Sequence, residues 1–411
     1  MSARMAAVDA QFYWMSAKVP SDQFLLYAFA GEPTDFECAV NEVRNRARAC
    51  RALTMRVDDG SPLTYPRWVP MAVESTQISR HQLDDCSWRG CLDAVIRLDE
   101  DQLDIRRAPW RLHLLAPVHG IPGRTGTGTV AVMQVAHALA DGTRASALAA
   151  WLFGRPVPVP DVMASRGFLP WHAVTAARAH RKLVQDIRAG LLRPPVGPRP
   201  VLSTNARPAG ARTLHTLVRH RSQLGGPTVT VAALAAVSSA LAAYLGDAAA
   251  SLIAEVPIAK TGVRQAYNHF FNATVGLYPD LTRQARVERI AADLANARRR
   301  SQHPAAHAAD RAFAAVPAPL LHWGVGKFDP ETRPTQVSGN TVLSSVYRGP
   351  GDLQFGGAPV LLTAGHPTLS PAMGLTHGVH GIGDIVAITV HAAESAVGDI
   401  DDYLARLDAE L

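Results

Sequence analysis

The chain has 411 residues, of which 47% are hydrophobic and 18% are charged. This length supports a large core but exceeds what one core usually holds, so two domains are expected. The formal net charge is +6, but acids lie between the basic residues. We interpret the densest basic cluster, residues 298–300, as a solvated helix face, with a phosphate or an anionic lipid headgroup as the alternative partner. Neither zinc-finger spacing nor interleaved aromatic and basic residues occur, so no nucleic-acid partner is expected.

The first half alternates buried strands with helices. Apolar runs predict strands at 23–31, 67–73, 110–118 and 130–135. Apolar residues at helical spacing after Asp35 predict a helix over 35–53. The glycine-rich segment 119–129 lacks the Gly-Lys-Ser/Thr ending of a phosphate-binding loop. Its glycine spacing instead indicates a hairpin turn between the two strands beside it.

A proline-rich segment divides the chain. A helix is predicted over 173–192, and the five prolines of 193–212 exclude regular structure there. The second half contains a core helix over 228–246 and a basic helix over 283–302. Its strands are predicted at 251–258, 273–281, 340–347 and 384–392.

Both halves mix strands and helices without a regular βαβ alternation. This pattern favours an α+β fold made of sandwiches over a doubly wound sheet. We therefore predict an N-terminal subdomain at 1–192, a linker at 193–212 and a C-terminal subdomain at 213–411.

One segment, 228–246, carries no charge over a membrane-like length. Its alanine and serine content makes it only weakly apolar. Thr228 supplies a helix start and Gly246 a helix stop. A buried core helix is therefore predicted, with a membrane span as the alternative.

The four cysteines show no Cys-x-x-Cys spacing and no pairing with histidine. Free thiols in a reducing compartment are expected, and no metal. The N-terminal segment lacks a signal-peptide pattern. We expect a cytoplasmic protein, with peripheral contact at the inner membrane face if its substrates are lipids.

The segment "MQVAHALADG" places His137 where an apolar strand meets an alanine-rich helix. A histidine titrates near neutral pH, so it can take a proton from an alcohol or amine that attacks a carbonyl. Asp141 could orient the ring or lock the loop by pairing with a distant arginine or lysine, and Gly142 permits close backbone approach. The alternative is a hydrogen-bonded core histidine.

"HALADG" resembles the His-x-x-x-Asp-Gly signature of the condensation-domain-like acyltransferases, which share the chloramphenicol acetyltransferase fold. The chain is most similar to the bacterial wax ester synthase and diacylglycerol acyltransferase group and to polyketide-associated acyltransferases. The fuller signature has two adjacent histidines. Ala136 stands at the first, and His137 stands at the second, which is the catalytic one.

The resemblance continues in order along nearly the whole chain, through 5–14, 107–115, 227–245, 256–281 and 344–360. Family positions are held by Asp9, Phe12, Pro109, Trp110 and Asn272. The chain departs from the family pattern at Ala136, Thr230, Val231 and Ser345. These departures leave the substrates open.

The resemblance implies two chloramphenicol acetyltransferase-like α/β sandwich subdomains with a tunnel between them. An acyl thioester, on coenzyme A or a carrier protein, would enter from one side and the acceptor from the other. His137 would act as general base and return the proton to the departing thiolate. The sequence contains no Gly-x-Ser-x-Gly elbow and no plausible cysteine nucleophile, so direct transfer without an acyl-enzyme is the simpler expectation.

The tetrahedral oxyanion needs hydrogen-bond donors. We expect these from the Gly142 N–H, Asn272 and Ser345, the last two also as substrate-binding residues. The alternatives are a strand-end hydrogen bond for Asn272 and an ordinary sheet position for Ser345.

By the same resemblance Asp141 is structural and pairs with a cation from the second half. Lys260 and Arg264 both lie near the matching loop. Of the two, Lys260 is the preferred partner.

Three functions remain open. The first is an O-acyltransferase of the wax ester synthase and diacylglycerol acyltransferase type. The second is a stand-alone condensation enzyme that forms an amide or ester in a peptide or polyketide pathway. The third is a catalytically silent binding protein of this fold. No cofactor is expected beyond acyl-coenzyme A or acyl-phosphopantetheine as substrate, and an acyl carrier protein is the candidate protein partner.

Overall fold

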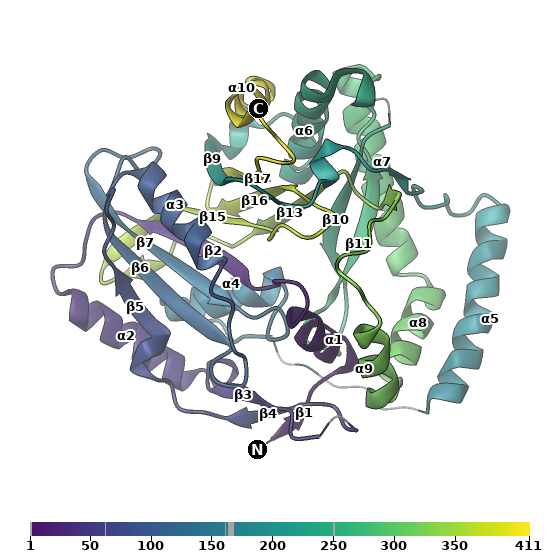
Figure 1. Ribbon diagram of the computed structural model, residues 1–411, viewed down its shortest axis with the longest axis horizontal. Coiled ribbons are helices and arrows are strands. Elements are labelled where there is room, and N and C mark those ends of the chain that lie inside the picture. The colour runs from purple at the N-terminus through teal and green to yellow at the C-terminus, as the bar shows by residue number, and fades with distance from the viewer. Residues whose placement is uncertain (1, 62, 161, 163–167, 250) are drawn as a thin grey trace.

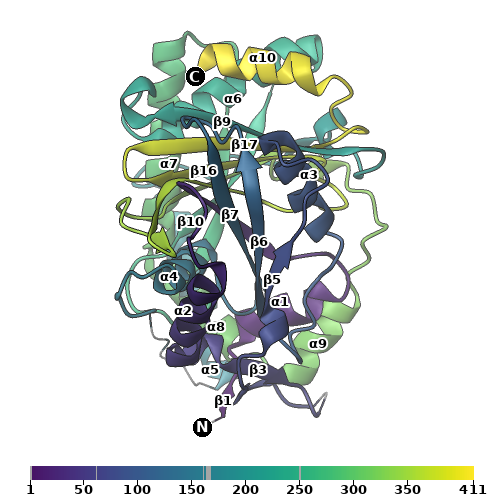
Figure 2. The same ribbon diagram turned by 90° about the vertical axis from the view of Figure 1, so that its left-hand side faces the viewer.

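The computed structural model describes residues 2–411 except 62, 161, 163–167 and 250. Two six-stranded sheets form its framework. Strands of the second sheet run across those of the first, with helices on the outer sides of both (Figures 1 and 2). This mixed α+β architecture of two sandwiches agrees with the predicted fold class.

The first sheet has the order β14-β15-β2-β7-β6-β5. Its strands are β2 (Gln23–Phe29), β5 (Ile78–His81), β6 (Trp110–His119), β7 (Thr127–Val135), β14 (Gln354–Phe355) and β15 (Ala358–His366). Strands β14 and β15 come from the second half of the chain, and β15 pairs antiparallel with β2. The second half therefore supplies strands to the first sheet, and the limits 1–192 and 213–411 stay a prediction.

Strand β2 is buried on both faces. Leu25, Tyr27 and Phe29 join one hydrophobic cluster, and the alternate residues Phe24 and Leu26 join another. Burial on both faces explains why its sequence is a continuous apolar run. Strands β6 and β7 pair antiparallel through the glycine-rich turn, which confirms the predicted hairpin.

The second sheet has the order β11-β10-β13-β16-β17-β9. Its strands are β9 (Arg212–His220), β10 (Ile253–Ala259), β11 (Phe270–Gly276), β13 (Thr341–Tyr347), β16 (Leu375–Ile382) and β17 (Ile385–Ala393). Two small sheets join β1 (Ala3–Arg4), β4 (Arg67–Pro70) and β3 (Met55–Asp58), and β8 (Arg199–Pro200) with β12 (Gln336–Val337).

Some helices lie along the outer sides of the two sheets, and those at the lower right of Figure 1 pack on one another beside the sheets. The helices are α1 (Ala7–Ser16), α2 (Phe36–Ala49), α3 (Trp88–Leu98), α4 (Gly142–Leu152), α5 (Leu169–Arg188), α6 (Val229–Leu245), α7 (Arg283–Ser301), α8 (Pro304–Ala314), α9 (Ala318–Gly326) and α10 (Ile400–Glu410). Helices α2, α6 and α7 confirm the predicted helices within a few residues. Asp35 caps α2 by accepting from the Cys38 N–H at 2.9 Å.

Three predicted boundaries are wrong. Helix α5 lies four residues earlier than expected, because Pro170 is accommodated in its first turn and Gly190 takes a left-handed φ of 74° just after its end. Strand β11 begins at Phe270 rather than 273 and ends at Gly276. The linker expected to lack regular structure contains β8 and a 3₁₀ turn at Ser203–Asn205, and its last residue, Arg212, begins the next strand.

Helix α6 begins the one segment among the described residues, Val229–Ala249, that is long and apolar enough to cross a membrane. Most of α6 is buried in the hydrophobic cluster of the second half. Thr228 caps it by accepting from the Val231 N–H at 3.2 Å. The structure therefore agrees with the predicted core helix.

Candidate active site

His137 lies in the turn between β7 and α4. Its partly buried ring stacks on Phe12 of α1, with centroids 4.1 Å apart and planes 5° apart. Phe270, at the start of β11, lies 5.7 Å from the same ring. Segments far apart in the sequence thus hold the imidazole in one plane.

Asn268 determines which nitrogen of His137 carries the proton. The Asn268 amide nitrogen donates to Asp9 at 2.9 Å and to the His137 carbonyl at 2.7 Å. Its amide oxygen therefore faces His137 Nδ1, 2.9 Å away. Because an amide oxygen can only accept, Nδ1 carries the proton and Nε2 keeps a free lone pair. This tautomer is the one that a general base requires.

Asp9 of α1 holds the Asn268 side chain in this orientation. Its carboxylate accepts the N–H groups of Tyr267 and Asn268 at 2.9 Å each. Burial raises the pKa of Asp9 to about 6, against the opposing effect of these hydrogen bonds. Asp9, Asn268 and His137 therefore form a connected hydrogen-bonded chain.

The pKa of His137 is lowered from its ordinary value, chiefly by burial. The hydrogen bond to Asn268 and the charge of Asp141 act in the opposite direction. The ring is consequently neutral at pH 7, with Nε2 able to accept a proton.

Asp141 links the two halves of the chain through an ion pair and hydrogen bonds. It caps α4 by accepting from the Arg144 N–H at 2.8 Å. Its carboxylate also lies 2.9 Å from an Arg264 nitrogen and accepts from the His269 N–H at 2.9 Å. Both side chains of the ion pair are buried, with exposed fractions of 10% for Arg264 and 4% for Asp141. Asp141 is thus structural, and Asn268, not Asp141, orients the ring.

Lys260 does not pair with Asp141, so the preference for it over Arg264 is wrong. Its ammonium group lies 2.8 and 2.7 Å from the two carboxylate oxygens of Asp310 on α8. The Lys260 N–H bonds to the His269 carbonyl at 2.9 Å, which closes the loop between them. The closed loop places the Arg264 side chain next to Asp141 and the Lys260 side chain next to α8.

A cavity of about 440 Å³ lies between the two sheets and is lined by residues of both. His137 and Gly142 line it from the first half of the chain, and Ser345 and Arg348 from the second. A second cavity of about 260 Å³ shares Phe270 with the first. Phe270 lines both cavities, and a continuous tunnel stays a prediction.

Two of the expected oxyanion donors line the larger cavity. Gly142 is the first residue of α4, where backbone N–H groups have no partner within the helix. A Cβ at Gly142 would lie 3.3 Å from Val346, so this position has little room for a side chain. Ser345 Oγ accepts from the Thr230 hydroxyl at 2.9 Å, which leaves its own proton available to the cavity.

Asn272 lies outside the site. It is exposed on β11, and its amide donates to Glu255 at 2.6 Å. The sequence comparison placed the family asparagine here, four residues after Asn268. The alternative reading of Asn272, a strand hydrogen bond, is the one observed.

Arg348 is a buried cation on the cavity wall, which the sequence did not indicate. It is 5% exposed and donates to the Ala364 carbonyl at 2.9 Å. Its Nε is buried without a hydrogen-bond partner. Within the described part of the chain no carboxylate pairs with it, and burial lowers its pKa. The cavity wall therefore contains a guanidinium that no carboxylate of the described residues pairs with, although Asp22 lines the same cavity.

The fold is shared with a wax ester synthase/diacylglycerol acyltransferase and with starter condensation domains. The structure of the wax ester synthase/diacylglycerol acyltransferase from Marinobacter aquaeolei VT8 aligns over 99% of this chain and 98% of its own, with a TM-score of 0.63 and 17% identity.

Starter condensation domains share the same architecture. A variant domain of rhizomide synthetase RzmA, solved with C8-CoA and Leu-SNAC, aligns over 98% of this chain and 92% of its own, with a TM-score of 0.56 and 15% identity. A second variant, in complex with C8-CoA, has a TM-score of 0.57 at 14% identity, over 99% of this chain and 92% of that one. These identities are low, so the likeness establishes the fold. No protein-family model matches the sequence, and no curated protein matches it significantly.

Proposed function

We propose that the protein is an acyltransferase that moves an acyl group from a thioester, on coenzyme A or a carrier protein, to a hydroxyl acceptor. The observation that carries this proposal is the position of the His137 ring, with Nδ1 2.9 Å from the Asn268 amide oxygen at the wall of a cavity. Its Nδ1–H donates to Asn268, and the ring lines a cavity between the two sheets. A neutral imidazole with a free Nε2 at a cavity wall is the arrangement of a general base.

In the proposed reaction Nε2 removes the acceptor proton while the acceptor oxygen attacks the thioester carbonyl. The tetrahedral intermediate collapses, the C–S bond breaks, and the imidazolium returns the proton to the departing thiolate. Ester and free thiol are the products. A positioned base of this kind contributes about 10²–10⁴-fold to the rate.

The oxyanion would be stabilised by the Gly142 N–H and the Ser345 hydroxyl. Both residues line the same cavity as His137. The Thr230 hydroxyl, which donates to Ser345, would favour the Ser345 proton pointing toward the substrate.

The second candidate is amide formation with an amine acceptor that carries a carboxylate. Arg348 favours it, because a buried cation without a carboxylate partner suits an anionic group of the substrate. The RzmA starter domain with a similar fold was solved with C8-CoA and Leu-SNAC. A contact with Arg348 would separate carboxylate-bearing acceptors from neutral ones. The acceptor panel below separates oxygen from nitrogen acceptors.

The third reading, a silent binding protein, is motivated by the loss of the first motif histidine at Ala136. The intact Asp9, Asn268 and His137 chain argues against it, since a silent site has no need of an oriented base. Donation by a carrier protein, peripheral membrane contact, a cytoplasmic location and the lack of a cofactor all stay predictions.

The test is thiol release from a panel of acyl-coenzyme A thioesters, with and without alcohols, hydroxy acids, amines and amino acids. Wild-type protein is compared with His137→Ala, whose folding is checked by circular dichroism and thermal melting. Acceptor-dependent release that the variant loses is expected. Equal release by both proteins, with carrier-bound donors included in the panel, would overturn the proposal.

A further inference from the structure

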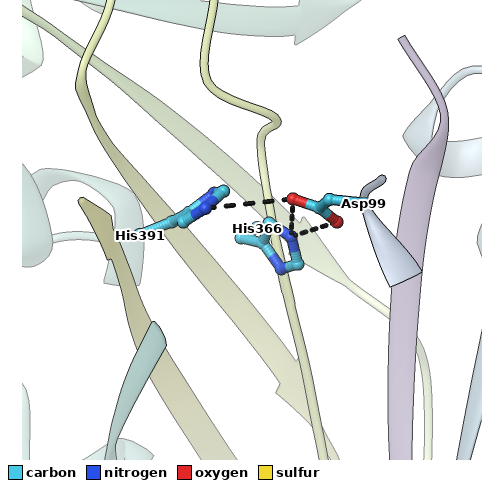
Figure 3. A group of neighbouring side chains, drawn as sticks. All are labelled: Asp99, His366 and His391. Carbon is cyan, nitrogen blue, oxygen red and sulfur yellow. Dashed lines mark hydrogen bonds and ion pairs between the residues drawn. The ribbon is translucent and has the colours of Figure 1, made fainter. Parts of the chain in front are cut away.

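Three buried side chains with metal-binding atoms converge at a point that the acyl-transfer proposal does not use (Figure 3). Asp99 follows the end of α3, His366 ends β15, and His391 lies in β17. Their exposed fractions are 3%, 6% and 0%. The cluster therefore joins a helix, the first sheet and the second sheet at one point.

The spacing of the ligand atoms suits a small divalent ion. His366 Nε2 lies 3.2 and 3.3 Å from the two Asp99 oxygens, and His391 Nε2 lies 3.8 Å from Asp99 Oδ2. All three ligand atoms lie within 4.8 Å of one another. Zinc holds nitrogen and oxygen ligands at about 2.0–2.2 Å, so two ligands of a tetrahedral site lie roughly 3.3 Å apart. Small side-chain shifts would close this cluster around an ion.

His391 supplies a second, independent observation. Its Nδ1 lies 3.4 Å from the Pro367 carbonyl, an acceptor, so Nδ1 carries the proton. Its Nε2 is buried without a hydrogen-bond partner and faces the Asp99 carboxylate. A lone pair that faces a carboxylate oxygen in a buried site is unfavourable unless a proton or a metal cation lies between them.

The charges around the cluster also favour a cation. Asp22 is a second buried carboxylate close enough to Asp99 for each to affect the other electrostatically. Among the described residues no lysine or arginine forms an ion pair with Asp99, and the nearby Arg212 is exposed.

The orientation of one candidate ligand is also fixed. Phe24 stacks on His366 with ring planes 4° apart and holds that imidazole in place.

We propose that Asp99, His366 and His391 bind a divalent first-row transition ion of the zinc class. Two imidazoles and one carboxylate form a known ligand set for such ions, with water as a further ligand. The ion would hold the two sheets together beside the cavity that His366 also lines. This site does not depend on the proposed acyl transfer.

The first experiment uses the full chain, stripped with a chelator and then titrated with CoCl₂ and ZnCl₂. One equivalent of Co²⁺ with the visible spectrum of a four-coordinate site is expected, displaced by Zn²⁺. A rise in Tm with Zn²⁺ is also expected. Stripped wild-type protein that binds neither ion tightly would overturn the proposal, whatever the variants do.

Two variants locate the ion. His391→Asn should lose the Co²⁺ spectrum and the Tm response to Zn²⁺. His81→Asn is the matched control, because His81 and His113 form a separate histidine pair with nitrogens 2.9 Å apart. It should keep both properties. Loss of the spectrum in His81→Asn alone would place the ion at the wrong site and overturn the assignment. If His391→Asn does not fold, X-ray absorption of the Co²⁺-loaded wild type must still show two imidazole ligands.

Discussion

Asn268 accepts the Nδ1 proton of His137 across the boundary between the two halves of the chain, at 2.9 Å. This bond selects the tautomer of the ring, and Asp9 in turn fixes the Asn268 amide. The proposed base is therefore oriented by residues from two segments that lie far from it in the sequence.

Asn268→Ala should lower kcat by about 10- to 100-fold with little change in KM, since the ring loses its orientation but the cavity stays open. Steady-state kinetics with the best acceptor would measure the effect. Asn272→Ala is the matched control four residues away, and its activity should equal that of wild type because Asn272 is exposed and bonds to Glu255. The reverse pattern would contradict the assignment of Asn268.

His137→Ala should lower kcat/KM by about 10²–10⁴-fold, the usual contribution of a general base. Its melting temperature should stay close to that of wild type, because the smaller side chain leaves the Asp9–Asn268 bonds in place. Activity of the folded variant within a factor of two of wild type would show that another group acts as base.

The pH profile should reflect the lowered pKa of His137. Only the neutral ring can accept a proton, so activity falls as the pH drops through the folded-state pKa. Burial moves that pKa below the ordinary 6.5, so the acid limb of log kcat/KM should lie below pH 6.5. An acid limb above 6.5 that tracks His137 would contradict the burial seen in the structure.

Arg264→Met should destabilise the fold by about 3 kcal/mol, because it leaves the buried Asp141 carboxylate without its cation. Lys260→Met removes a partly exposed pair with Asp310 and should cost less than about 1 kcal/mol. Urea unfolding of the two variants would compare these losses. Equal losses would mean that Asp141 gains little from Arg264.

Arg348→Met should raise KM for carboxylate-bearing acceptors about tenfold or more and leave neutral alcohols almost unaffected. The reason is that the buried guanidinium has no anionic partner among the residues that the structure describes. Arg348→Lys keeps the charge and should recover part of the affinity. A uniform loss for all acceptors would assign Arg348 to packing alone.

The site residues that are neighbours in the sequence were easier to predict than those that only the fold brings together. His137, Asp141 and Gly142 lie together in one turn, so their juxtaposition was readable from the residue order. The pairing of Asp141 with Arg264 rather than Lys260 depends on how the loop closes, which residue order does not reveal. Asn268 was missed for the same reason, because its role arises from contacts with Asp9 and His137 across the fold.

The fold was predicted to the level of strands, helices and two mixed halves. The exchange of β15 into the first sheet was not, because a buried apolar strand has no local feature that selects its partner. The surroundings of Arg348 and the grouping of Asp99 with two histidines could not be predicted from the sequence either, because the residues in contact come from both halves of the chain.

The position of β15 has a consequence for synthesis on the ribosome. Until residue 366 has emerged, β2 has β7 on one side and an open hydrogen-bonding edge on the other. That nascent edge is strongly apolar and would favour pairing with other chains. The N-terminal half therefore has to be kept from aggregating for most of the translation time, and a truncated chain that ends in the linker would expose the same edge permanently.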